Sequence, residues 1–329
     1  MWKSRVLLRC FQLWLIVGLC VVTTAAFADT IRLAIQKTGT VAWELDVART
    51  HGFDKDAGLT IDTLELASPE AGKIALRGGS TDMMVADWLW VSRERDLGAK
   101  LVFYPYSTAL GGVMVSGDSS IHTLADLKGK SLAVAGGPID KSWLLLAAAT
   151  KQQGVDLKQQ ARIVYGAPAL LAAKMQQGET DAMLNYWNFC ARLEAQGFRR
   201  IADIEDLLPR FGAKGKLSMI GYVFDERWAQ AHRSTVARFV EMAAKAKQVL
   251  MTSDEEWQRI APLTGASDAA TLKIYRERYR QGIPNRSIDA EEADAQVLYR
   301  VLAKLGGPAL VGEGKELAPG TFYRPQTKD

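Results

Sequence analysis

The stretch TLADLKGKSLAVAGGPID, residues 123–140, divides the sequence into two halves with similar patterns. Its first part, Thr123–Lys130, has the form of a helix end that is closed by Gly129. Ser131–Ala135 is an apolar run of strand length, and Gly136-Gly137-Pro138 then opens a predicted helix. Short β-rich runs alternate with helical segments on both sides of this stretch, which indicates parallel strands joined by crossover helices. The fold class is therefore α/β.

The alternation predicts two sets of elements and a helical C-terminal region. In the first half we predict strands over residues 31–36, 60–66, 82–86 and 100–106, and helices over 41–51, 69–77 and 88–97, the last with Asp87 as N-cap. In the second half we predict strands over 131–135, 162–165, 181–185 and 218–224, and helices over 138–152, 168–177 and 186–196. Further helices are predicted over 227–251, 254–260, 268–281 and 290–305. Residues 306–329 are predicted to form an extended tail that packs on the unit built by the first half of the chain.

The N-terminus has the three parts of an export signal. Lys3, Arg5 and Arg9 precede an apolar run over residues 10–22, and Ala26-Phe27-Ala28 is a small-x-small cleavage pattern. The apolar run is shorter than the roughly 18–20 residues that span a bilayer. We therefore predict a signal peptide over residues 1–28, cleavage before Asp29 and a periplasmic product.

Charge and cysteine content exclude several classes of function. The leader removes three of the 41 basic residues and none of the 37 acidic ones, so the mature chain is nearly neutral. A nucleic-acid-binding surface would need a clustered basic face, and we predict no nucleic-acid partner. Of the three cysteines, only Cys190 follows the leader, so an internal disulfide is impossible. The roughly 300 mature residues exceed the usual size of one domain, which predicts two lobes.

Three segments resemble the periplasmic binding proteins of nitrate, sulfonate, taurine and thiamine-precursor importers. His51–Leu59 is similar to the family's glycine-aromatic helix exit, and Ala75–Asp82 is similar to its entry into the third strand. Thr123–Lys130 before a strand is the most specific of the three segments. The likeness is clearest over residues 30–225.

This resemblance implies a two-lobed receptor whose α/β lobes are joined by a two-strand hinge. Lobe I would comprise residues 29–110 and 222–329, with the helical C-terminal third packed on it, and lobe II would comprise 112–217. The hinge would lie near 108–112 and 217–222. The protein would be a monomer that clamps a small molecule and delivers it to the permease and ATPase subunits of an ABC importer.

Candidate ligand-binding residues follow the predicted strands, because open α/β sheets bind ligands beyond the carboxyl ends of their strands. Five of the seven mature tryptophans fall in or near these positions, although Trp90 is expected to face the core. The predicted binding residues are Thr38, Trp43, Asp87, Trp88, Asp140, Lys141, Trp143, Asn185 and Trp187.

The acids at the two predicted helix starts bear on the charge of the ligand. Asp87 and Asp140 stand beside tryptophans, and an acid with an aromatic face suits a cationic or planar molecule. Alternatively, both acids only cap their helices. Lys141 could neutralise Asp140 or meet a ligand carboxylate. We expect a planar or cationic ligand, with an anion of the sulfonate or taurine type, or a metal chelate, as alternatives.

An enzyme that acts on a thiamine- or quinone-precursor-like compound is the alternative of another class. His51, His122 and His232 have no metal-ligand spacing. Cys190 lies in a predicted helix, where a buried structural thiol is more common than a nucleophile. The sequence therefore predicts no catalytic residues, no cofactor and no metal.

Overall fold

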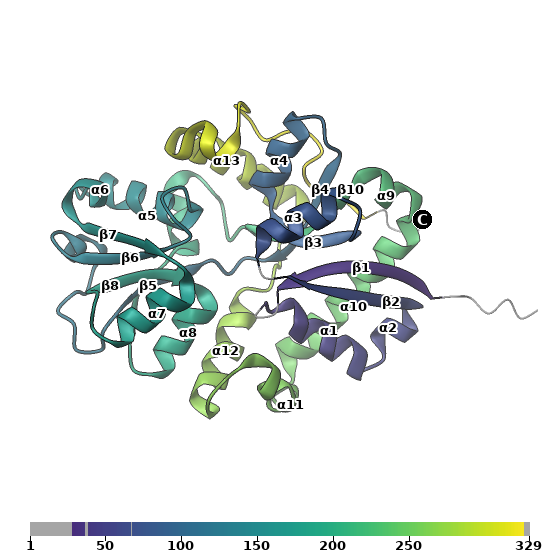
Figure 1. Cartoon of the computed structure of the whole chain (residues 1–329), viewed down its shortest axis with the longest axis horizontal. Helices are drawn as coiled ribbons and strands as arrows, with labels where there is room; N and C mark the ends of the chain where they lie inside the picture. Colours follow the sequence, from purple (N-terminus) through teal and green to yellow (C-terminus); the bar gives the residue numbers. More distant parts are fainter. Residues whose placement is uncertain (1–27, 37–38, 67, 326–329) are drawn as a thin grey trace, which may run out of the picture.

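The computed structural model describes residues 28–36, 39–66 and 68–325. They form two lobes, each built on a five-stranded sheet (Figure 1). The strand order is β2-β1-β3-β10-β4 in lobe I and β7-β6-β8-β5-β9 in lobe II. Within the described ranges, no helix has the length and apolar character needed to cross a membrane. The predicted signal peptide lies outside these ranges except for Ala28.

The strands of each sheet are mostly those that the alternation predicts. Lobe I contains β1 (Asp29–Gln36), β2 (Leu59–Leu66), β3 (Met83–Asp87), β4 (Leu101–Ser107) and β10 (Ile220–Asp225). Lobe II contains β5 (Gly111–Val115), β6 (Ser131–Ala135), β7 (Arg162–Gly166), β8 (Ala182–Tyr186) and β9 (Arg199–Asp203). β1 runs parallel to β2 and β3, and β6 runs parallel to β7 and β8.

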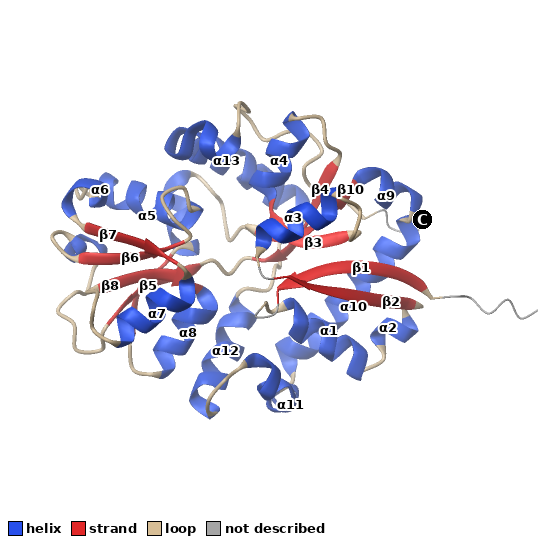
Figure 2. Cartoon of the chain, viewed as in Figure 1, coloured by secondary structure: helices blue, strands red, loops and turns tan. Residues whose placement is uncertain are grey.

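Helices cover the faces of both sheets (Figure 2). The first half of the chain contributes α1 (Val41–Thr50), α2 (Phe53–Asp56), α3 (Pro69–Arg77) and α4 (Trp88–Asp96). Lobe II carries η1 (Leu124–Leu127), α5 (Lys141–Gln152), α6 (Leu157–Gln160), α7 (Pro168–Gln176), α8 (Trp187–Ala195) and η2 (Glu205–Phe211). The C-terminal region consists of α9 (Glu226–Ala231), α10 (Arg233–Thr252), α11 (Asp254–Thr264), α12 (Ala269–Gln281) and α13 (Ile288–Val311).

Each crossing between the lobes delivers one antiparallel strand. The chain leaves lobe I after β4, and β5 then pairs antiparallel with β8 and β9 in lobe II. It returns to lobe I as β10, which pairs antiparallel with both β3 and β4. Gly111, which lies in the hinge segment 108–112 implied by the resemblance, is the first residue of β5. Its φ of 148° and the nearby carbonyl oxygen of Asn185 leave no room for a side chain.

Several predicted boundaries differ from the structure. The predicted helix 138–152 begins only at Lys141, because Gly136 and Gly137 adopt positive φ and Asp140 is the N-cap. The predicted helix 227–251 is two helices, with His232 between them. The predicted tail is helical as far as Val311, with a kink at Gly307. Beyond it, the strand-like contact of Phe322 with Phe103 packs the tail on lobe I.

The C-terminal helices connect the two lobes as well as covering lobe I. α10 and α11 pack on α1 of lobe I. α12, however, packs closely on α8 of lobe II, and α13 contacts both α4 and α5 (Figure 1). The lobes are therefore joined by helix packing as well as by the two chain crossings. The position of the hinge stays a prediction.

Candidate functional site

A cleft of about 510 Å³ lies between the two lobes. Six helices begin at its wall, namely α1, α3 and α4 from lobe I and α5, α7 and α8 from lobe II. Each of them follows the carboxyl end of a strand, which is where open α/β sheets bind ligands. The volume falls in the range of small-molecule sites.

The wall of the cleft is mainly apolar and has polar groups in a few places. Its apolar side chains include Ile35, Leu66, Met84, Trp187, Phe189 and Met219. Its polar and charged side chains include Thr40, Lys73, Asp87, Tyr106, Asp140, Lys141 and Tyr186. Such a wall suits a small organic molecule that has an apolar body and a polar group.

An ion pair spans the cleft from one lobe to the other. Lys141 Nζ, at the first turn of α5, lies 3.3 Å from Asp87 Oδ2, at the start of α4. The other carboxylate oxygen of Asp87 accepts a 2.9 Å hydrogen bond from the backbone amide of Trp90 and so caps α4. Burial alone would raise the pKa of Asp87, but the charge of Lys141 and the hydrogen bond from Trp90 outweigh it, and the pKa is lowered. Asp87 is therefore an ionised carboxylate with its partners already in place.

Asp140 caps α5 from the other wall. Its Oδ1 accepts hydrogen bonds of 2.9 Å from the amide of Ser142 and 3.2 Å from the amide of Trp143. Burial raises its pKa, although Lys141 acts in the opposite direction. The pKa of Lys141 is itself raised, because the attraction of Asp87 and Asp140 outweighs the effect of burial. Burial, with a contribution from Asp140, raises the pKa of Tyr186 to about 12.

Four of the predicted binding residues line the cleft: Asp87, Asp140, Lys141 and Trp187. Both acids also cap helices, which was the alternative interpretation of these positions. Thr38 lies outside the described residues. That any of these side chains binds a ligand stays a prediction.

The other predicted tryptophans lie in hydrophobic cores and not at the cleft wall. Trp88 and Trp143 are completely buried. Trp43 is 5% exposed and packs within an aromatic cluster, with ring centroids 5.8 Å from Trp257 and 6.1 Å from Trp187. A position near a strand end therefore does not decide the direction of the side chain.

Asn185 is also turned away from the cleft. It is buried at 2% exposure, and its side-chain amide donates a 2.9 Å hydrogen bond to the carbonyl oxygen of Pro168. Its side-chain oxygen accepts from the backbone amide of Tyr186. Asn185 thus fixes the loop that precedes α8, because both of its polar atoms bond to backbone.

Several wall residues were missed from the sequence. Thr40 and Tyr106 come from lobe I, and Tyr186 and Phe189 come from the start of α8. Thr40 and Tyr186 are the N-caps of α1 and α8, and their side chains make no capping bond. A polar N-cap after a predicted strand was thus an available signal for Thr40. Tyr106 lies near the end of its strand, and nothing in its neighbourhood distinguishes it from a core residue.

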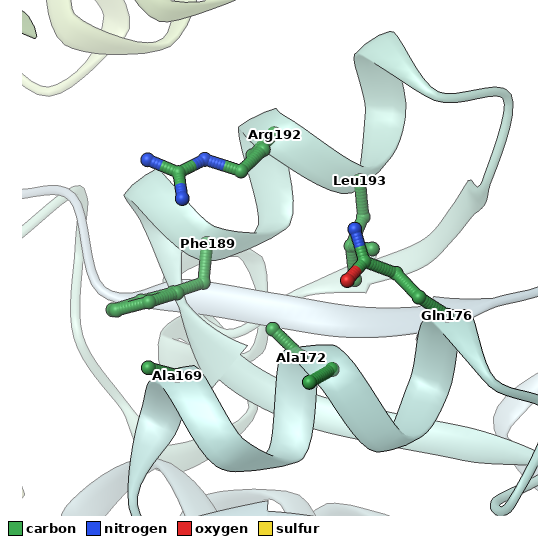
Figure 3. Close-up of a pocket in the computed structure, with 7 residues that line it drawn as sticks. Ala169, Ala172, Gln176, Phe189, Arg192 and Leu193 are labelled. Atoms are coloured by element: carbon green, nitrogen blue, oxygen red, sulfur yellow. The ribbon is translucent and has the colours of Figure 1, made fainter. Parts of the chain in front are cut away.

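A smaller pocket of about 100 Å³ lies beside the cleft on lobe II, between α7 and α8 (Figure 3). Phe189 and Ala169 line both spaces, and Gln176 and Leu193 lie at the opposite end of the smaller one. Its volume holds only a few water molecules. The main cleft is therefore the candidate ligand site.

Metal-ligand groups and the thiol of Cys190 are the features that bear on the enzyme alternative. Within residues 28–36, 39–66 and 68–325, no three His, Cys, Asp or Glu side chains are placed to hold a metal ion. Cys190 is completely buried, and burial raises the pKa of its thiol to about 11. A buried thiol of this kind is a poor nucleophile at neutral pH.

Solved structures similar to this chain include receptors and an enzyme. The periplasmic aliphatic sulphonate binding protein SsuA of Escherichia coli is 20% identical with a TM-score of 0.72, over 92% of this chain and 94% of that chain. The alkanesulfonate-binding SsuA of Xanthomonas axonopodis pv. citri, bound to MOPS, is 21% identical with a TM-score of 0.66, over 90% and 98%. The desulfurization enzyme DSZB is 18% identical with a TM-score of 0.56, over 86% and 97%. At these identities the likeness shows the fold alone.

Family comparison gives a more specific result. A comparison with curated proteins finds no match. The family model described as "NMT1/THI5 like" matches residues 43–256, which include most of both lobes and the cleft. The chain therefore belongs to the NMT1/THI5-like family and has the two-lobed fold of the periplasmic binding proteins.

Proposed function

We propose that the protein is the extracytoplasmic solute-binding component of an ABC-type importer. The observation that carries this proposal is the inter-lobe cleft of about 510 Å³ with an ion pair from Lys141 to Asp87 across it. A cleft whose walls come from two lobes can open for a solute and close around it. Family membership and the sulfonate-binding relatives of the same fold support this function.

The wall indicates which kind of solute fits. Among the described residues most of the wall is apolar, and the charged groups are two acids and two lysines. We infer a small organic molecule with an apolar body and one polar head group. The cationic or planar ligand favoured by the sequence stays a prediction, but its basis is weaker, because Asp87 and Asp140 already bond to Lys141 and to helix amides. An anionic head group of the sulfonate type is the alternative.

The remaining parts of the proposal concern location and partners. The predicted leader directs the chain across the cytoplasmic membrane, and cleavage before Asp29 releases it into the periplasm. The permease and ATPase subunits of the importer are the proposed partners of a monomeric receptor.

Two measurements test the function. Native mass spectrometry of protein purified without denaturation identifies any solute that co-purifies. Thermal-shift and calorimetric titrations then use three probes that share a five-carbon tail: pentanesulfonate, hexanoate and pentyltrimethylammonium. We expect at least one probe to bind, and small-angle scattering to show a smaller radius of gyration at saturation. Failure of all three probes, with no co-purifying solute, would contradict the proposal.

An enzyme is the alternative of another class, since DSZB has a similar fold. The described residues of the cleft wall include no cysteine and no histidine, and the thiol of Cys190 is buried against the carbonyl oxygens of Gly112 in β5 and Asn185 in β8. Mass spectrometry of the bound solute after prolonged incubation distinguishes the two functions, because a receptor returns the solute unchanged.

A further inference from the structure

A buried ion pair lies beneath the lobe I wall of the cleft. The carboxylate of Glu44 in α1 bonds to the ammonium of Lys247 in α10, and their side chains are 3% and 13% exposed. The same carboxylate accepts hydrogen bonds from the hydroxyls of Tyr279 and, at 3.3 Å, Tyr222. A buried charge pair is costly unless its remaining hydrogen-bonding capacity is used, and here two tyrosines use it. Its position below the cleft, where an apolar core would suffice for folding, suggests a role in the site.

Tyr106 connects this buried pair to the cleft. The Lys247 ammonium lies 4.0 Å from the centroid of the Tyr106 ring, which is cation–π distance. The Tyr106 hydroxyl lies 2.7 Å from the hydroxyl of Thr40. Thr40 and Tyr106 both line the cleft, whereas Tyr222, Tyr279 and Glu44 do not. The hydroxyl pair is therefore the part of this network that a ligand can reach.

The hydroxyl pair has a spare proton. Tyr106 can donate its proton to Thr40 or to the nearby carboxylate of Glu44, which already accepts from Lys247, Tyr279 and Tyr222. When Tyr106 donates to Thr40, the proton of Thr40 is not used within the pair. Burial, together with the negative charge of Glu44, raises the pKa of Tyr106 well above its usual value, so its hydroxyl stays protonated. One proton of the pair can consequently be donated to an acceptor atom in the cleft.

We propose that Thr40 and Tyr106 form the specificity element of the cleft and donate a hydrogen bond to an oxygen of the ligand head group. Glu44 and Lys247 are positioning residues, because they fix the ring and hydroxyl of Tyr106 from behind. This inference rests on the proposed receptor function and names the head group as one that carries acceptor oxygens, such as a carboxylate or a sulfonate.

The test uses the three five-carbon probes with wild-type protein, Tyr106→Phe, Thr40→Val and the variant that carries both substitutions. Hexanoate and pentanesulfonate carry acceptor oxygens, and pentyltrimethylammonium carries none. We expect the wild type to bind an oxygen-bearing probe. In Tyr106→Phe or Thr40→Val the remaining hydroxyl keeps a proton, so each single variant should weaken that binding less than the double variant Thr40→Val/Tyr106→Phe does. For the double variant we expect a loss of about tenfold, as loss of a hydrogen bond to a charged group implies.

Tyr222→Phe is the matched control, because Tyr222 also bonds to Glu44 but does not line the cleft. It should leave the affinity for hexanoate unchanged. The double variant Glu44→Gln/Lys247→Met avoids an unpaired buried charge and tests positioning. It should lower the affinity for hexanoate more than the affinity for pentyltrimethylammonium. General loosening of the lobe would instead lower both affinities by the same factor.

Three results would overturn the inference. They are unchanged hexanoate and pentanesulfonate affinity in Thr40→Val/Tyr106→Phe, an equal loss in Tyr222→Phe, and binding of pentyltrimethylammonium alone by the wild type. The last result would leave the proposed receptor function intact. Absence of binding by all three probes would count against both proposals.

Discussion

Lys141 of lobe II and Asp87 of lobe I form an ion pair across the cleft, with 3.3 Å between Nζ and Oδ2. Both residues stand at the first turn of a helix, so each helix start faces the other lobe. The pair is only partly exposed, with 25% of the Lys141 side chain and 16% of the Asp87 side chain open to solvent. We therefore expect this pair to stabilise the arrangement of the lobes seen in the structure.

Lys141→Met should shift the protein without ligand toward an open form. The substitution leaves the partly buried carboxylate of Asp87 unpaired, and opening lets water solvate it. Small-angle scattering should show a larger radius of gyration than for the wild type. Lys151→Met is the control, because Lys151 pairs with Asp156 inside lobe II. Equal radii for Lys141→Met and the wild type would contradict this role.

Arg278→Met should open the lobes through a second contact. Arg278 in α12 lies 3.1 Å from Glu194 and 3.4 Å from Asp203, both of lobe II. Arg276 on the same helix instead pairs with Asp254 of α11, so Arg276→Met is a matched control. Arg278 and Lys141 share no partner. We therefore expect the increases in radius of gyration of Arg278→Met and Lys141→Met to add in the variant that carries both substitutions. A radius for Arg278→Met equal to that for Arg276→Met would argue against a bridging role.

Trp43→Ala should reduce stability more than it reduces ligand affinity. Trp43 packs against Trp257, Tyr275 and Tyr279, and removal of a buried tryptophan costs about 3–5 kcal/mol of unfolding free energy. Urea unfolding measures the loss, and calorimetry below the transition measures binding. If Trp43→Ala kept its stability and lost ligand binding, the prediction would be wrong and Trp43 would be a ligand contact.

Glu205→Gln should change how stability depends on pH. Burial raises the pKa of Glu205 to about 7; a hydrogen bond from its own backbone amide opposes the shift, and Asp203 adds to it. The folded state therefore holds this proton more tightly than the unfolded state does, and the stabilisation is lost as pH rises from about 4.5 to about 7. The stability gained by Glu205→Gln should grow over that interval and then level off. Asp206→Asn, at an exposed neighbour, is the control.

N-terminal sequencing of the exported protein should begin at Asp29. The side chain of Asp29 accepts a 2.7 Å hydrogen bond from Thr235 and pairs with Arg238, so the first mature residue would be anchored on α10. A product that keeps residues 1–28 in the membrane fraction would contradict the predicted cleavage.

The sequence predicted the order of elements well because the alternation of strand and helix is local. It did not predict β5, since glycines such as Gly111 and Gly112 are poor strand formers and only pairing with β8 and β9 makes this segment a strand. It also missed the break at His232, because nothing in the hydrophobic pattern interrupts there. Both features depend on contacts between distant parts of the chain.

The candidate site was predicted in part, for a related reason. Asp87 and Asp140 were found because an acid after a strand is a natural N-cap, and N-caps at strand ends face the cleft. Trp88 and Trp187 occupy the same first position of their helices, yet one is in the core and the other lines the cleft. The direction of such a side chain is decided by the helices packed around it, and the sequence pattern does not contain that information.

The late return of the chain to lobe I as β10 also limits the order in which the two sheets can form. All strands of lobe II lie between residues 111 and 203, so that sheet can form as soon as this segment emerges. Lobe I cannot, because β10 is the strand that fills the gap between β3 and β4. In a chain that emerges N-terminus first, β4 therefore stays separate from β2, β1 and β3 until β10 has emerged, after all strands of the second sheet. During that interval the edges of β3 and β4 are unpaired, and a chain cut before Ile220 would keep these edges exposed to aggregation.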